Sequence, residues 1–406
     1  MSRPTAVLIG TRVFTPEPIP AAFRQEALAL ALESVGADVT VLTTVPPSGT
    51  QGAAAAKRVK RFPVKRDSMG QVRGYASYMS FDIPLFLRIL LARRVDAVVA
   101  EPPPTTGLFA LVAATIRRAP LIFYAADVWS DAAESVGGVP RFVLRAVRWM
   151  ETTVWKRSAA VLTISPGVQK RLEELVGPRG SFHMIGNGVD TDVFTPDGPL
   201  ADDRPSAPYF LYAGTVSEWQ GADVLVEGFA QLADTHPEAQ FIFFSEGTGR
   251  DELEAMVTER GIAGVQFRGR APASVVAASM RDAAAGVSSI TPGLGYEFAL
   301  PTKMYAASAC GTPIIHAGEG AANELVSGNS LGWAVEYTPD AVAAAMRAAL
   351  DGDRPTREHL RAWTEEHASL RGCARKGAEA VLRAVREQKQ RRVRLPSGGA
   401  GQLHQR

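Results

Sequence analysis

Residues 289–315 join a glycine-containing loop to a predicted helix, and a helix start of this kind can bind an anion. Pro301 suits the first helical position, where its missing N–H needs no partner, and Gly311 is placed to end the helix. A short apolar strand, Pro313 to His316, follows. The segment therefore predicts a loop, a helix start and a buried strand in immediate succession.

The first turn of this predicted helix carries the charge that an anion site needs. Thr302 and Lys303 stand there, beside the free N–H groups and the positive end of the helix dipole. A diphosphate arriving over Gly293 and Gly295 would meet them. Glycine loops before helices are also common structural turns, so the loop alone leaves both interpretations open.

The spelling of this segment, Leu300-Pro-Thr-Lys-Met-Tyr and then Ala309-Cys-Gly-Thr-Pro-Ile-Ile, resembles the donor-nucleotide segment of the retaining glycosyltransferases of family 4. Ile185-Gly-Asn-Gly-Val-Asp resembles the interdomain signature of that family, and Tyr212-Ala-Gly-Thr resembles its C-domain glycine turn. The resemblance implies the α/β GT-B fold, in which two Rossmann-like domains have parallel sheets facing across a cleft.

By this resemblance, Gly214, Thr215 and Gln220 of the glycine turn would hold the donor phosphates. The family has an arginine and a lysine where this chain has Thr215 and Gln220, so Lys303 is the candidate for the compensating charge. Arg270 follows a predicted strand, in a loop with which the family reads the donor base.

The family also carries two glutamates eight positions apart, and these positions hold Phe298 and Ala306 here. Glu297 lies one residue early and is the carboxylate candidate of this loop. Because no carboxylate replaces Ala306, a degenerate, nonbinding relative stays open as an alternative.

The acceptor side offers one carboxylate of interest. Asp127-Val-Trp is similar to the Asp-Leu-Trp motif of the bacterial polysaccharide transferases of the WbuB and colanic-acid type. Asp127 would then orient the acceptor or sugar, as a general base or hydrogen-bond acceptor. An N-cap of the helix that follows is the alternative role for Asp127.

The composition fits a two-domain enzyme. With 406 residues, 46% hydrophobic content and only two cysteines, the chain can bury two cores but has no disulfide framework or cysteine metal site. The start Met1-Ser-Arg-Pro lacks a signal-peptide pattern, and no apolar run approaches the roughly 20 residues of a membrane span. We therefore expect a cytoplasmic protein.

Positive charge gathers in two segments, although the net charge is only +2. Ten basic and two acidic residues lie between Lys57 and Arg94, and the same counts apply from Arg371 to Arg406. The first segment also contains apolar residues between Tyr75 and Leu90, so it predicts peripheral attachment to the inner face of an anionic membrane. A solvated face and an ordinary packed helix are the alternatives.

Short apolar strands alternate with amphipathic helices along the chain, which indicates parallel sheets covered on both faces. We expect an acceptor-side domain at 1–195, a donor domain at 205–370 and a basic, disordered tail at 391–406. Residues 195–208 are the linker candidate. By the resemblance, a helix at about 371–390 crosses back to the first domain.

These observations together predict a retaining glycosyltransferase that moves a hexose-type sugar from a nucleotide diphosphate to a polysaccharide or lipid-linked acceptor. No Asp-x-Asp motif calls for a metal, and no cofactor or nucleic acid is expected. A noncatalytic nucleotide-sugar-binding or assembly protein is one alternative. The other is a sugar epimerase with this fold, which the lack of histidines before His183 disfavours.

Overall fold

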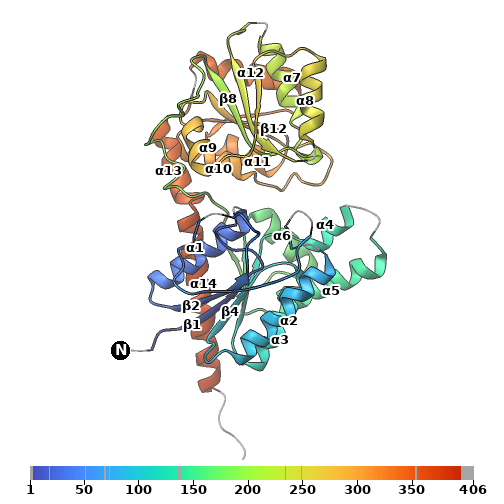
Figure 1. Cartoon of the computed structure of the whole chain (residues 1–406), viewed down its shortest axis with the longest axis vertical. Helices are drawn as coiled ribbons and strands as arrows, with labels where there is room; N and C mark the ends of the chain where they lie inside the picture. The colour runs from blue at the N-terminus through green and yellow to red at the C-terminus, as the bar shows by residue number, and fades with distance from the viewer. Residues whose placement is uncertain are drawn as a thin grey trace, which may run out of the picture. The chain divides into compact units, whose positions relative to one another are not determined.

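The computed structural model describes residues 3–17, 19–50, 52–67, 70–72, 74–135, 139–233, 235–247, 249–352 and 354–394 (Figure 1). The chain forms two compact units. Unit 1 contains Met1–Ile185 and Ala374–Arg406, and unit 2 contains Gly186–Cys373. Unit 2 is thus inserted into the sequence of unit 1.

Unit 1 is built on a parallel sheet of seven strands in the order β3-β2-β1-β4-β5-β6-β7. The strands are β1 (Ala6–Gly10), β2 (Asp38–Thr44), β3 (Val59–Phe62), β4 (Ala97–Ala100), β5 (Leu121–Ala125), β6 (Ala160–Thr163) and β7 (Phe182–Met184). The helices are α1 (Pro20–Ser34), α2 (Tyr75–Leu91), α3 (Pro104–Ile116), α4 (Trp129–Ser135), α5 (Arg141–Arg157), α6 (Pro166–Val176) and α14 (Leu370–Arg394).

Each face of this sheet has its own apolar core, because successive strand residues point to opposite faces. Val7 and Ile9 of β1 pack with Leu28 of α1 and Val381 of α14. On the other face, residues of α2, α3, α5 and α6 pack around Leu8. Both faces are buried, which explains why the strand sequences are continuous runs of apolar residues.

Unit 2 repeats this plan with six parallel strands in the order β10-β9-β8-β11-β12-β13. The strands are β8 (Tyr209–Thr215), β9 (Gln240–Glu246), β10 (Val265–Arg268), β11 (Ala285–Ser289), β12 (Ile314–Ala317) and β13 (Gly332–Val335). The helices are α7 (Asp223–Ala233), α8 (Arg250–Glu259), α9 (Ala273–Met280), α10 (Thr302–Ala309), α11 (Ala321–Gly328), α12 (Pro339–Asp351) and α13 (Arg357–His367), with a short 3₁₀ turn at Glu218–Gln220.

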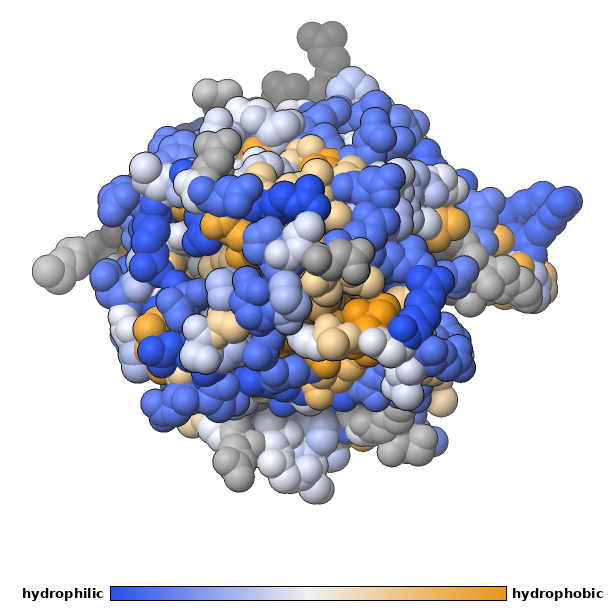
Figure 2. Space-filling view, turned by 90° about the horizontal axis from the view of Figure 1, so that it is seen from above, coloured by the Kyte–Doolittle hydropathy of each residue, from blue (hydrophilic) through white to orange (hydrophobic). Residues whose placement is uncertain are grey.

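Two helical layers cover the sheet of unit 2. Residues of α7, α8 and α12 pack on the face that carries Phe210 and Tyr212, and residues of α9, α10, α11 and α13 pack on the face that carries Leu211. Two parallel sheets covered by helices confirm the predicted α/β class. Figure 2 shows one face of the molecule, where hydrophilic residues cover most of the surface and hydrophobic residues form smaller areas between them, an ordinary pattern for a folded protein.

The polar segment 195–208, expected to be the linker, is held within unit 2 by one arginine. The Arg281 guanidinium donates to the carbonyl oxygens of Val193, Thr195 and Pro199 at 2.6–3.1 Å. The chain instead passes between the units at Ile185–Gly186 and at Cys373–Ala374. Of the basic tail predicted at 391–406, residues 391–394 continue α14, and the rest lies outside the described residues.

Candidate functional site

The carboxyl edge of the sheet in unit 2 gathers most of the predicted donor-site residues. The strand order runs outward from β8 on one side and from β11 on the other, so the order reverses between these two strands. Open parallel sheets bind ligands at such a point. Gly214, Thr215 and Gln220 follow or end β8, and Gly293, Gly295 and Glu297 follow β11.

Contacts between the two loops hold this edge together. The Trp219 and Tyr296 rings are stacked, with centroids 4.9 Å apart, and the Thr291 N–H donates to the Trp219 carbonyl. Tyr337 adds a hydrogen bond from its hydroxyl to the Gly221 carbonyl. The loops after β8 and β11 therefore form one continuous rim.

Lys303 lies under this rim without a polar partner. Its Nζ atom is fully buried, donates no hydrogen bond to any described residue and lies 3.4 Å from the centroid of the Tyr212 ring. Burial lowers the pKa of Lys303 well below its usual value. An ammonium buried without an acceptor is costly, which is why burial favours the neutral amine.

Glycine is required where Lys303 crosses the strand end. Gly214 has a φ of 148°, and a Cβ there would come within 3.2 Å of the Lys303 Cε. Gly293 and Gly295 adopt φ values of 80° and 77°, in the left-handed region that glycine permits without steric cost. Both glycines are exposed, so their backbone is open to a ligand.

The start of α10 differs by one residue from the expectation. Pro301 is the N-cap, with φ −60° and ψ 122°, and Thr302 is the first helical residue. The extended ψ of Pro301 keeps it outside the helix. No side chain caps this helix start, and of the N–H groups in its first turn that of Met304 donates to the Pro301 carbonyl at 3.1 Å.

Gln220 stabilises the glycine turn from inside. It is buried, and its Oε1 accepts hydrogen bonds from the Ser217 hydroxyl at 3.1 Å and the Thr215 hydroxyl at 3.4 Å. Thr215 itself is exposed at the end of β8. Lys303 therefore remains the cation nearest to this turn among the predicted donor-site residues.

Glu297 is tied to its own loop. Its Oε1 accepts the Gly293 N–H at 2.7 Å. Backbone N–H groups, its own first and then those of Gly293 and Gly295, lower the pKa of Glu297 against a smaller opposing effect of burial. The carboxylate is therefore ionised near neutral pH and closes the glycine loop.

Arg270 reaches the end of the neighbouring strand through one ion pair. It follows β10, two strands away from β8, and its exposed guanidinium pairs at 3.2 Å with Glu246, the last residue of β9 and the register partner of Thr215. The structure thus brings together the predicted residues from β8, the loop after β11 and α10, and connects Arg270 to this edge only through Glu246.

A buried histidine lies beside this site, and no sequence motif predicts a functional role for it. His316 ends the predicted strand after α10, its side chain is fully buried, and its Nδ1 lies 2.9 Å from the Ser288 hydroxyl. Its Nε2 has no partner among the described residues. Burial, reinforced by the charge of Lys303, lowers the pKa of His316 to about 4.

In unit 1, Asp127 lies at the carboxyl edge of the sheet, two residues after β5. The residue is exposed to solvent. Partial desolvation of its carboxyl group by the neighbouring protein nevertheless raises its pKa, and the charge of Arg24 opposes this effect. The N-cap role belongs to another residue, because the Glu151 carboxylate accepts the Trp129 N–H at 2.7 Å and the Ser130 N–H at 2.9 Å. Asp127 forms no hydrogen bond with any described residue.

Arginines and a buried acid surround this edge of unit 1. Arg12 stacks on the Tyr78 ring at 4.5 Å and on the Trp129 ring at 5.8 Å. Glu101 is buried and accepts hydrogen bonds from the Thr11 hydroxyl and the Gln25 amide. The edge therefore combines aromatic rings with hydrogen-bonding groups, which suits a hydroxylated ligand.

The described residues lack two further features. They contain no group of three or more histidine, cysteine, aspartate or glutamate side chains arranged to hold a metal ion. None of their helices combines the length and apolar character needed to cross a bilayer.

Comparison with known proteins agrees with this architecture. Residues 21–188 match the family model described as "Glycosyl transferase 4-like domain", and residues 207–352 match "Glycosyl transferases group 1". The glycosyltransferase of Rickettsia africae has the same fold, with a TM-score of 0.71 at 15% identity over 95% of this chain and 99% of that one. The Anabaena protein HepE in complex with UDP gives a TM-score of 0.67 at 16% identity, over 93% of this chain and 100% of HepE.

Fold and matched domains define a two-domain α/β protein of the GT-B class. Within that class, the chain belongs to the family 4-like glycosyltransferases. A D-inositol 3-phosphate glycosyltransferase from Jonesia denitrificans is 31% identical over 239 residues. The match spans 54% of this chain and 54% of that relative.

Proposed function

We propose that this protein is a retaining glycosyltransferase that moves a hexose-type sugar from a nucleotide diphosphate sugar to a polysaccharide or lipid-linked acceptor. One observation carries the donor part of this proposal. The Nζ atom of Lys303 is buried without an acceptor, under a glycine rim and at an uncapped helix start. A diphosphate would supply the missing negative charge.

The family membership and the neighbours support this donor class. HepE has been solved with UDP and with UDP-glucose, and it shares the fold of this chain. Lys303 is also the only lysine between residues 186 and 373. Unit 2 therefore has one ammonium with which to bind the donor, and it lies at the rim.

The reaction needs only groups that the chain and donor provide. The bond between the sugar C1 and the phosphate oxygen breaks, and the acceptor oxygen bonds to C1 on the same face. The acceptor proton passes to the leaving phosphate, whose charge Lys303 and the α10 N–H groups stabilise. Asp127 orients the acceptor hydroxyl in unit 1. The proposed step uses no metal ion.

Membrane docking of unit 1 belongs to the same proposal, since a lipid-linked acceptor stays at a bilayer surface. Lys57 and Lys60 are exposed, and Ile83, Leu87 and Leu91 form an exposed stripe along α2. Three arginines of the basic segment have other partners. Arg58 pairs with Asp38, Arg61 donates to the Thr44 and Thr15 carbonyls, and Arg66 pairs with Glu17. We place the protein in the cytoplasm, at the inner face of the membrane.

Lys303→Met tests the donor site while it keeps the length of the side chain. We expect the variant to bind UDP at least tenfold more weakly than the wild type, because a charge-assisted contact is lost, and to bind uridine unchanged. Titration calorimetry with UDP, GDP and ADP selects the base, and titration with uridine gives the affinity for the nucleoside. Equal loss for nucleotide and nucleoside, or no loss, would show that Lys303 does not bind the diphosphate.

Product analysis separates activity from binding alone. Incubation with the nucleotide sugar of the selected base and a lipid-linked acceptor should release the nucleoside diphosphate and yield a glycoside that retains the anomeric configuration of the donor. Binding without transfer would favour the noncatalytic alternative. Conversion of the donor to an epimer would favour the epimerase.

A further inference from the structure

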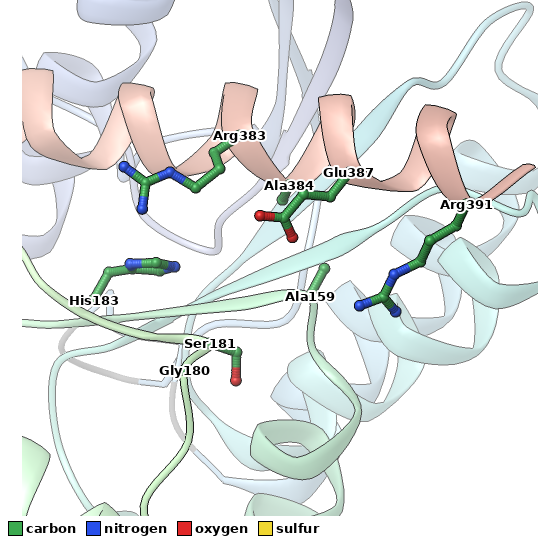
Figure 3. Close-up of a pocket in the computed structure, with 8 residues that line it drawn as sticks. All are labelled: Ala159, Gly180, Ser181, His183, Arg383, Ala384, Glu387 and Arg391. Atoms are coloured by element: carbon green, nitrogen blue, oxygen red, sulfur yellow. The ribbon is translucent and has the colours of Figure 1, made fainter. Parts of the chain in front are cut away.

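A polar groove runs between the last strand of the unit 1 sheet and α14, away from every residue assigned above. Figure 3 shows its lining: His183 and the chain at Gly180 and Ser181 lie opposite Arg383, Glu387 and Arg391 of α14, and the Ser181 hydroxyl points away from the helix. The hollow measures about 210 Å³. Because one water molecule takes up about 30 Å³ in the liquid, a hollow of this size can hold a small solute but not a polymer.

The charged groups of the groove are exposed and unpaired. Glu387 stands four residues from both Arg383 and Arg391, a spacing at which helix side chains commonly pair. Within the described part of the chain, however, neither arginine nor Glu387 forms an ion pair or side-chain hydrogen bond. Figure 3 shows Arg383 and Glu387 on the side of α14 that faces His183, and Arg391 directed toward Ala159. Their hydrogen-bonding capacity is therefore free for a ligand.

The mixture of charges indicates what the ligand must contain. Two guanidiniums, about 12 Å apart at their Cα atoms on the helix, favour a phosphate oxygen set at either end of the groove. The Glu387 carboxylate between them repels a simple anion but accepts hydrogen bonds from hydroxyl groups. Burial, and then the charge of Arg383, lowers the pKa of His183, so that its ring is neutral and can also donate one N–H.

We propose that this groove is a second ligand site, which binds a phosphorylated polyhydroxy compound of monosaccharide size. The phosphate pairs with one of the two guanidiniums, the other guanidinium donates to sugar oxygens, and the sugar hydroxyls donate to Glu387. A second hollow, of about 300 Å³ and lined by Ile185, Arg383 and Lys376, adjoins the first. Ile185 precedes the crossing into unit 2 and Lys376 follows the return, so a bound ligand fastens β7 to α14 beside both crossings.

Glucose 6-phosphate, with glucose and inorganic phosphate as matched probes, tests this site on the full-length protein. We expect titration calorimetry to show binding of glucose 6-phosphate, and Arg383→Ala and Arg391→Ala each to weaken it by about tenfold. Arg386→Ala is the control, because Arg386 is exposed on the same helix but does not line the groove. It should leave the affinity unchanged.

Glu387→Gln gives the signature of a mixed site. Removing the negative charge should strengthen binding of inorganic phosphate while weakening the preference for glucose 6-phosphate over inorganic phosphate. Lys303→Met should leave all three titrations unchanged, which separates this groove from the donor site. The proposal fails if the wild type binds no glucose 6-phosphate at millimolar concentration, if Arg386→Ala weakens binding as much as Arg383→Ala, or if Lys303→Met abolishes it. It also fails if Glu387→Gln leaves the phosphate affinity and the preference unchanged.

Discussion

His316 makes the stability of unit 2 sensitive to mild acid. Its imidazole is buried and neutral, with a pKa of about 4, whereas an unfolded histidine titrates near 6.5. Between these values the unfolded chain binds a proton that the folded chain does not. The free energy of unfolding must therefore fall as the pH drops from about 6.5 to about 4, by about 3 kcal/mol in total for this one residue.

His316→Gln isolates this effect. Urea unfolding at pH 7 and pH 5 should show a smaller loss of stability in the variant than in the wild type. Asp82, Glu101 and Glu151, whose pKa values burial raises, favour the folded chain in acid, but they are common to both proteins and cancel in the comparison. Identical pH profiles for the two proteins would contradict the neutral state of His316.

Asp127 should be needed for turnover and dispensable for folding. Asp127→Asn removes the proposed acceptor contact, so we expect the transfer rate to fall a hundredfold or more, as roughly 10²–10⁴-fold is typical of general acid–base groups. UDP affinity should not change. Glu151→Ala is the contrasting variant, because it removes the two bonds that cap α4 and should lower the melting temperature. A melting temperature that drops in Asp127→Asn instead would assign that residue to folding.

At the scale of elements, two helical glycines predict opposite effects of one substitution. A Cβ at Gly228 of α7 would lie 2.5 Å from the Val342 side chain and 2.9 Å from the Pro339 carbonyl, both in α12. Overpacking of this kind costs about 1–3 kcal/mol, so Gly228→Ala should destabilise the protein. Gly328 of α11 has open space at the same position. Gly328→Ala should therefore stabilise by about 0.5–1 kcal/mol, as measured by chemical denaturation; destabilisation there, or a neutral Gly228→Ala, would refute this packing argument.

The elements recovered from sequence are those whose burial is uniform. β1 and residues 241–244 of β9 are apolar because helices cover both sheet faces, and their sequences predict these strands. β3 is not predicted from the sequence, because it is an edge strand with Lys60 and Arg61 in its middle. β11 is not predicted from the sequence either, because its residues are small and polar. They pack closely against neighbouring elements, with Gly286 against Ala307 and Ser288 against His316.

The site divides in the same way. The local sequence alone predicts that Lys303 and the glycine loop lie together at a helix start. That Lys303 folds onto the Tyr212 ring depends on two residues ninety positions apart, which no local pattern reports. Likewise, Glu151 caps α4 from the next helix, so the sequence near Asp127 points to the wrong capping residue.

At the scale of the whole molecule, the two units differ in how the chain builds them. Unit 2 is one continuous segment with its own cores. We expect residues 186–373, expressed alone, to unfold cooperatively and to bind UDP through Lys303. Residues 1–185 alone lack Ala378, Val381 and Val385 of α14, which belong to one core of unit 1, and should not fold stably. Thermal melts followed by circular dichroism test both fragments; a cooperative transition in 1–185 would show that α14 is not required.

The return of α14 to unit 1 has a consequence for synthesis on the ribosome. The face of the first sheet that α14 covers stays exposed until the whole of unit 2 has been translated, roughly 10–40 s at ordinary elongation rates. During this interval Val7, Ile9 and Leu28 have no final covering, while unit 2 can already fold. The N-terminal half of the nascent chain is thus the part that a chaperone must shield, and α14 is the segment whose arrival releases it.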